Sequence, residues 1–164
     1  MTRTLIAYAT KAGSTAEIAE ILAEELRRWS MDVTVANMSD KPDPAGYDLV
    51  IAGSAVNGAA WLAPAIVWVT AQQSKLKQQR VAIFNVCLNA ADPAKQDEAL
   101  GYNKWAADKV EPFASTSFAG RYRPETVGFF RRLLLRSMSK AAQDHIDPVA
   151  IRTWARDLVG QTAI

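Results

Sequence analysis

A short loop of hydroxyl-bearing and small residues joins the first apolar run of the chain to its first helical pattern. Its members are Thr10, Lys11, Ala12, Gly13, Ser14 and Thr15. Gly13 permits a tight turn, and a helix that begins here exposes unpaired backbone N–H groups and a partial positive charge. Together with the hydroxyls and the Lys11 ammonium, these donors suit a phosphate group.

The same residues have a second interpretation. Ser14 and Glu17 are spaced as in the capping box S-x-x-E, which begins a helix without any ligand. The dinucleotide pattern G-x-G-x-x-G and the nucleotide-binding pattern G-x-x-x-x-G-K-[ST] are both absent. A dinucleotide or a Mg-nucleotide is therefore disfavoured, and the loop alone leaves phosphate binding and simple capping both open.

Strand-like and helical patterns alternate along the chain. Helical patterns cover 14–29, where Ile18, Leu22, Leu26 and Trp29 line one face, and also 64–76, 93–110, 126–142 and 148–160. Strands are predicted at 4–9, 33–38, 47–54, 81–84 (within the segment 80–88) and, more weakly, 115–120. This alternation predicts a single α/β domain over 1–164, with a doubly wound, five-stranded parallel sheet and helices on both faces. In such folds ligands bind beyond the carboxyl ends of the strands.

The composition excludes several kinds of site. The chain has one cysteine, Cys87, and one histidine, His145, so an intramolecular disulfide, a Cys-rich metal site and a Ser-His-Asp triad are not expected. We interpret His145 as a surface residue and expect no metal. No run reaches the 18 to 20 apolar residues, approximately, that span a bilayer, and no secretion signal opens the sequence. A cytoplasmic protein is predicted.

Positive charge gathers late in the chain, in a basic amphipathic helical segment at about 121–142. Residues 121–140 carry six basic side chains and one acidic one. Such a helix either packs on the sheet or binds an anionic lipid or substrate. If it binds lipid, the protein is expected to be cytoplasmic but peripheral to the inner face of the membrane. The candidate contact residues are Arg121, Arg123, Arg132 and Arg136. No nucleic-acid-binding motif accompanies them.

The run Leu5–Thr15, continuing into Ile18 and Ala19, resembles the start of flavodoxins, whose signature is an apolar strand, then T/S-x-T-G-x-T, then a helix. The resemblance implies strand order 2-1-3-4-5 and FMN as the cofactor. The chain resembles the flavodoxin-like protoporphyrinogen oxidases that use quinone more than it resembles the electron-transfer flavodoxins. Those proteins carry an extra aromatic and basic segment like Arg121–Arg123 and Phe129–Lys140.

The resemblance also implies that the flavin ring lies between the loops that follow the third and fourth strands. A flat ring needs apolar contact together with donors and acceptors at its edge. Trp61 is a candidate stacking partner, with a buried anchor or a subunit contact as the alternatives, and Cys87 is interpreted as small packing material. The predicted loop residues are Ala55, Val56, Asn57, Gly58, Asn85, Val86, Cys87, Leu88 and Asn89.

Three functions remain open at this point. The first is an FMN-binding flavodoxin-like oxidoreductase or electron-transfer protein whose redox partner or small-molecule substrate is not identified. The second is an enzyme resembling the quinone-dependent protoporphyrinogen oxidases, with a quinone as its partner. The third is a cofactor-free binding or regulatory domain on the same fold.

Overall fold

The computed structural model describes residues 1–122 and 143–162. Its main sheet contains the parallel strands β1 (Arg3–Ala9), β2 (Asp32–Asn37), β3 (Leu49–Asn57), β5 (Arg80–Cys87) and β6 (Ala114–Ala119). They lie in the order β2-β1-β3-β5-β6. The predicted order of a doubly wound sheet is confirmed.

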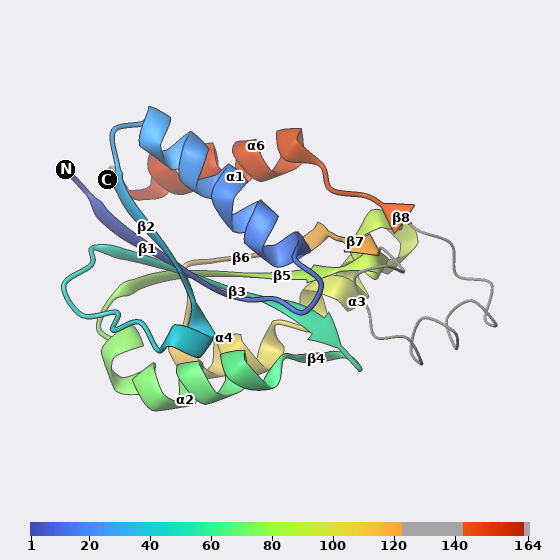
Figure 1. Ribbon diagram of the computed structural model, residues 1–164, viewed down its shortest axis with the longest axis horizontal. Coiled ribbons are helices and arrows are strands. Elements are labelled where there is room, and N and C mark those ends of the chain that lie inside the picture. Colours follow the sequence, from blue (N-terminus) through green and yellow to red (C-terminus); the bar gives the residue numbers. More distant parts are fainter. Residues whose placement is uncertain (123–142, 163–164) are drawn as a thin grey trace.

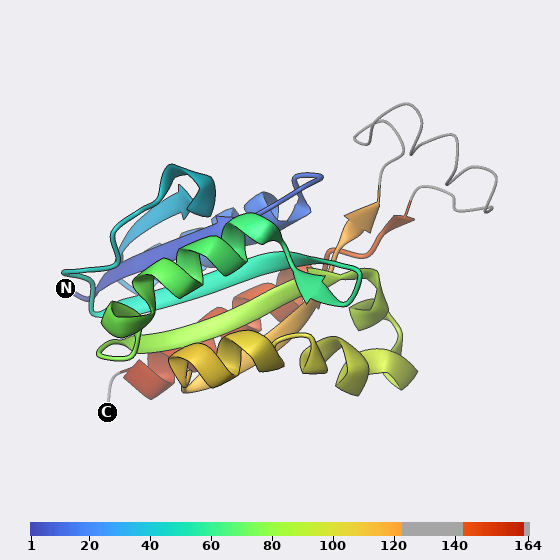
Figure 2. The same cartoon turned by 90° about the horizontal axis from the view of Figure 1, so that it is seen from below.

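Helices cover both faces of this sheet (Figure 1). The helices α1 (Ser14–Arg28) and α6 (Pro148–Thr162) lie on one face. The helices α2 (Ala63–Leu76) and α4 (Lys104–Val110) cover the other face, and α3 (Gln96–Gly101) lies near the carboxyl end of β6, as Figure 2 also shows. Three short 3-10 turns complete the connections: η1 (Met38–Asp40), η2 (Leu88–Ala91) and η3 (Pro93–Lys95).

A buried apolar layer holds each face together. Ile18, Leu22 and Leu26 of α1 are fully buried, at the helical spacing that the sequence predicts. Trp29, which was expected to extend this stripe, lies just beyond the end of α1 and is 54% exposed. The helix ends before its last apolar residue can reach the core, so that part of the prediction is wrong.

The close approach of Phe84 to Gly53 fixes the middle of the sheet. A Cβ atom on Gly53 would lie 2.1 Å from the Phe84 ring, so only glycine fits beneath that ring. Phe84 in turn contacts the rings of Phe118 and Trp154, with centroids 5.7 and 6.2 Å away. This cluster joins β5, β6 and α6.

Two predicted elements have different bounds in the structure. The predicted strand over 47–54 continues to Asn57 and turns into the short strand β4 (Ala60–Trp61). The predicted helix over 93–110 is divided into η3, α3 and α4, because the chain turns at Tyr102 and Asn103 to bring the Asn103 side chain inside. Asp92 caps η3, accepting a hydrogen bond from the Ala94 N–H.

A second, two-stranded sheet lies beyond the carboxyl end of the main one (Figure 1). It pairs β7 (Arg121–Tyr122) with β8 (Gln143–Asp144) in antiparallel fashion. The predicted helix over 126–142, and with it Arg123, Arg132 and Arg136, lies outside the described residues. Among the helices of 1–122 and 143–162, none is long and apolar enough to cross a membrane.

Candidate functional site

Three connections leave the same edge of the main sheet, where β1, β3 and β5 end. Ala9 at the end of β1 is paired with Ser54, and Ala55 is paired with Val86. Cys87 is paired with Ala119 at the end of β6. The register therefore brings the loop 10–15, the end of β3 and the end of β5 together, as a doubly wound sheet requires.

The N-terminus of α1 does not use the predicted capping box. Gly13 is the N-cap residue, with φ +94°, and no described side chain caps the helix. Ser14 is already helical, so its hydroxyl cannot serve as the N-cap acceptor. The Gly13 N–H instead donates to the Thr10 hydroxyl oxygen at 2.9 Å, which closes the loop. The first turn of α1 thus keeps N–H groups that no side chain satisfies.

A buried hydroxyl lies in that first turn. Thr15 is fully buried, and its Oγ1 atom finds no hydrogen-bond partner among the described residues. An unpaired buried hydroxyl costs about 1–3 kcal/mol, so the site is suited to an acceptor group. Ser14 lies beside Gly120, since a Cβ on Gly120 would be 3.4 Å from its Oγ atom. The end of β6 therefore closes one side of the loop.

The β3–β4 hairpin forms the second wall. Gly58 and Ala59 both have positive φ and make a two-residue turn, joining the pair Asn57 and Ala60. Asn57, Gly58 and Ala59 are exposed, and Ala55 and Val56 are half-buried. The sequence predicted only a loop here; the hairpin, with Gly58 and Ala59 at the two central turn positions, was not predicted.

Trp61 lies beneath this hairpin. The indole is 4% exposed, and its N–H donates to the Asn103 side-chain oxygen at 3.0 Å. It offers no open face for stacking, so the stacking prediction is corrected in favour of the buried anchor.

Asn85 is also committed to the interior. Its side chain is fully buried, donates to the Ala99 carbonyl and the Asn103 oxygen, and accepts from the Ser117 hydroxyl. The expectation of an Asn85 side chain free to face a ligand is therefore corrected.

Val86 is buried, Cys87 and Leu88 are half-buried, and all three follow Asn85 at the end of β5 and the start of η2. The Cys87 sulfur lies 3.6 Å from the Ser117 hydroxyl. Asn89 donates to the Tyr102 hydroxyl, which donates to the Glu98 carboxylate at 2.9 Å. This bond to Glu98 raises the pKa of Tyr102.

Arg121 is not an open contact residue. Its side chain is 18% exposed, and its guanidinium bonds both carboxylate oxygens of Glu17 while Nε donates to Asp144 at 2.8 Å. These hydrogen bonds, that to Glu17 above all, raise the pKa of Arg121. The prediction that Arg121 meets a substrate or membrane is corrected, because this guanidinium joins α1 to the β7–β8 pair.

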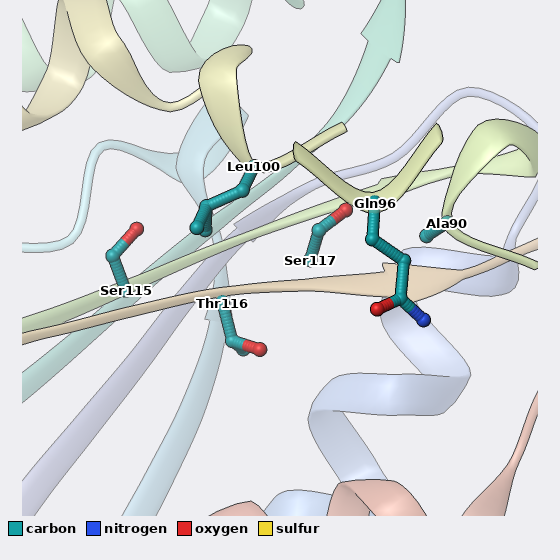
Figure 3. A pocket seen from close by; sticks show the side chains of 6 residues that line it. All are labelled: Ala90, Gln96, Leu100, Ser115, Thr116 and Ser117. Carbon is teal, nitrogen blue, oxygen red and sulfur yellow. The ribbon is translucent and has the colours of Figure 1, made fainter. Parts of the chain in front are cut away.

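A groove lies along β6, next to the segment 88–91 that follows β5. It consists of two cavities of about 300 and 370 Å³, which share Ala90, Gln96 and Ser117. Figure 3 shows Ser115 and Ser117 pointing to the side of α3, with Thr116 on the opposite side of the strand. The groove is separate from the loop 10–15.

Sequence reasoning missed the residues that support these loops. Asn103, Ser117 and Gly120 lie in segments predicted as plain helix or strand, and their roles depend on contacts with distant segments. Within residues 1–122 and 143–162 no cluster of His, Cys, Asp and Glu is suited to a metal ion.

Comparison with known proteins agrees with this geometry. The chain is 25% identical over 155 residues to protoporphyrinogen IX dehydrogenase [quinone] of Escherichia coli strain K12, covering 88% of this chain and 83% of that protein. A short-chain flavodoxin associated with a bacterial microcompartment superposes with a TM-score of 0.62 at 14% identity, covering 99% of both chains. A Fusobacterium nucleatum flavodoxin mutant bound to flavin mononucleotide gives 0.50 at 15% identity, covering 71% of this chain and 68% of that one.

The two structural likenesses concern the fold, because both identities are low. The family model for the flavodoxin domain matches residues 5–148, which is most of the chain. The chain therefore belongs to the flavodoxin domain family.

Proposed function

We propose that this protein is an FMN-dependent oxidoreductase that holds the cofactor phosphate at the N-terminus of α1 and the flavin ring between the ends of β3 and β5. The observation that carries the proposal is the uncapped first turn of α1, begun by Gly13 in the left-handed conformation and placed in register with both loops.

The residues present fit a phosphate monoester. The Thr10 oxygen already accepts from Gly13, so its own proton is available for donation. Thr15 has a buried hydroxyl without a described partner, and Lys11 is exposed beside them. A helix N-terminus with such donors is suited to an anion.

The ring site is supported by small side chains and by a lack of charge. Ala55, Val56, Asn57 and Gly58 form one flank, and Val86, Cys87, Leu88 and Asn89 form the other. Neither flank contains a charged residue. Bound FMN would supply the redox chemistry, while this chain binds and orients it. A flavin gains negative charge on reduction, and loops without acidic residues do not repel that charge. The neutral loops therefore favour an oxidoreductase over an electron-carrier flavodoxin with acidic loops.

The test is binding selectivity. The purified protein is titrated with FMN, riboflavin and FAD, following the quenching of flavin fluorescence, with folding verified by circular dichroism. We expect FMN to bind most tightly, since riboflavin lacks the phosphate. Equal affinity for FMN and riboflavin would contradict the phosphate assignment, and a folded protein that binds neither would support the cofactor-free alternative.

A second candidate is the oxidation of a porphyrinogen with a quinone as electron acceptor. It is supported by the 25% identity to the E. coli dehydrogenase across 88% of this chain. It is also supported by the basic composition of residues 123–140, with five basic side chains and one acidic one, which suits an anionic substrate. Turnover of protoporphyrinogen with a menaquinone analogue tests it directly.

A shortened variant tests the part played by residues 123–142 in that second activity. Tyr122 is paired with Gln143, so Asn-Gly in place of residues 123–142 completes a two-residue hairpin turn. We expect this variant to bind FMN like the parent and to lose porphyrinogen turnover. Unchanged turnover would show that the segment does not contribute to the activity.

A further inference from the structure

The Arg121 guanidinium lies against the helix turn proposed to hold the phosphate. It bonds both oxygens of Glu17, and Glu17 belongs to the first turn of α1. The backbone before it is fixed in the same place, because a Cβ on Gly120 would lie 3.4 Å from the Ser14 Oγ atom. Arg121 thus approaches the phosphate loop from the end of β6.

The charge of Glu17 creates a conflict in that turn. A carboxylate in the first turn stabilises a free helix, but it repels a phosphate monoester, which carries about −1.5 to −2 charges at pH 7. The Glu17 side chain is 43% exposed, so solvent only partly screens it. Lys11 in the loop is exposed to solvent, so a cation held directly against the Glu17 carboxylate would favour phosphate binding further.

Arg121 supplies that cation from a fixed position. Its side chain is 18% exposed, and Asp144 on β8 accepts from Nε at 2.8 Å. The hydrogen bond to Asp144 on β8 therefore holds the Arg121 guanidinium against the Glu17 carboxylate on α1. A planar guanidinium suits such paired contacts with a carboxylate better than an ammonium does.

We propose that Arg121 is a positioning residue for FMN, which acts through Glu17: by offsetting the charge of that carboxylate it helps the first turn of α1 to accept a phosphate dianion. The inference rests on the proposed function. It assigns to Arg121 a contribution to the discrimination between FMN and riboflavin, rather than direct contact with either.

The test is a double-mutant cycle on FMN affinity. Arg121→Gln leaves Glu17 uncompensated and should weaken FMN about tenfold or more, as expected for an added unit charge near a dianion, while riboflavin affinity changes little. Glu17→Gln in the Arg121→Gln background should restore most of the loss. Arg121→Lys should retain most of the affinity, and Lys104→Gln, an equal charge change at an exposed pair on α4, should have no effect.

Ionic strength provides a second readout. The loss of FMN affinity caused by Arg121→Gln should become smaller as the salt concentration rises, because exposed charges are screened over about 10 Å at 0.1 M salt. A salt-independent loss shared by FMN and riboflavin would overturn the inference in favour of a purely structural role. A loss that Glu17→Gln fails to restore would instead indicate direct contact of Arg121 with the phosphate. If the parent protein itself binds no FMN, the proposed function fails before the cycle begins.

Discussion

The indole N–H of Trp61 donates a 3.0 Å hydrogen bond to the side-chain oxygen of Asn103, and neither residue is more than 4% exposed. The bond joins the β3–β4 hairpin to the junction between α3 and α4. The same oxygen accepts from Asn85, and the Asn103 amide donates to Ser115 and to the Thr116 carbonyl. One buried amide therefore holds the structures behind both proposed ring loops.

Replacing Asn103 by alanine should destabilise the fold strongly. The change leaves the buried Trp61 and Asn85 donors without their shared acceptor, which costs about 2–4 kcal/mol in the free energy of unfolding. Urea unfolding measures it. Gln78→Ala, at an exposed side chain, is the matched control and should cost less than about 0.5 kcal/mol. Equal stability of the two variants would show that the network contributes little.

Replacing Gly13 by valine should weaken FMN far more than riboflavin. A β-branched residue at φ +94° forces the loop to rearrange, which displaces the N–H groups proposed to meet the phosphate. Competition between the two flavins measures the selectivity. Gly160→Val, on α6 with open space around it, serves as control. The prediction fails if both flavins lose affinity in parallel.

A methyl group on Gly53 should disrupt the centre of the sheet. Its Cβ would overlap the Phe84 ring, and overpacking of this kind costs about 1–3 kcal/mol or more. Thermal unfolding of Gly53→Ala measures the loss. Adding Phe84→Leu should recover part of it, because the smaller side chain makes room. An additive double mutant would indicate that the ring is not the source of the strain.

Acid stability should depend on Arg156 through Glu25. Glu25 is 3% exposed and accepts from Arg156 at 2.8 Å; this bond, together with Trp29, lowers its pKa. A lowered pKa contributes stability above the unfolded value of about 4.3, and that stability is lost as the pH falls through the folded pKa. Arg156→Gln should therefore be most destabilising at neutral pH and approach the parent in strong acid, as measured by urea unfolding across pH. A constant difference would contradict this origin.

Periodicity was sufficient to predict the centre of the main sheet, because β1, β3 and β5 are buried on both faces and read as apolar runs. The edge strands β2 and β6 are only partly buried, and their order along the chain indicated them more than their apolar content did. It also predicted the buried stripe Ile18, Leu22 and Leu26. It could not divide the helix over 93–110, since the break depends on Asn103 reaching partners on β5 and β6. Local pattern contains no information about such distant partners.

The loop 10–15 was placed correctly at the carboxyl edge of the sheet, but its cap was not. Ser14 and Glu17 match the capping box in spacing, yet Gly13 begins the helix and Glu17 pairs with Arg121, more than a hundred residues later. Trp61 and Asn85 were singled out for their chemical type, and both are occupied by buried hydrogen bonds. Residue type indicated the region of the site but not the direction of these side chains.

The most direct test of the central claim is an equilibrium titration of the purified, folded protein with FMN, followed by flavin absorbance and fluorescence. We predict saturable binding of one FMN per chain at micromolar concentration or below, with clearly weaker binding of riboflavin. A folded protein that leaves FMN unbound at these concentrations would contradict the proposed function.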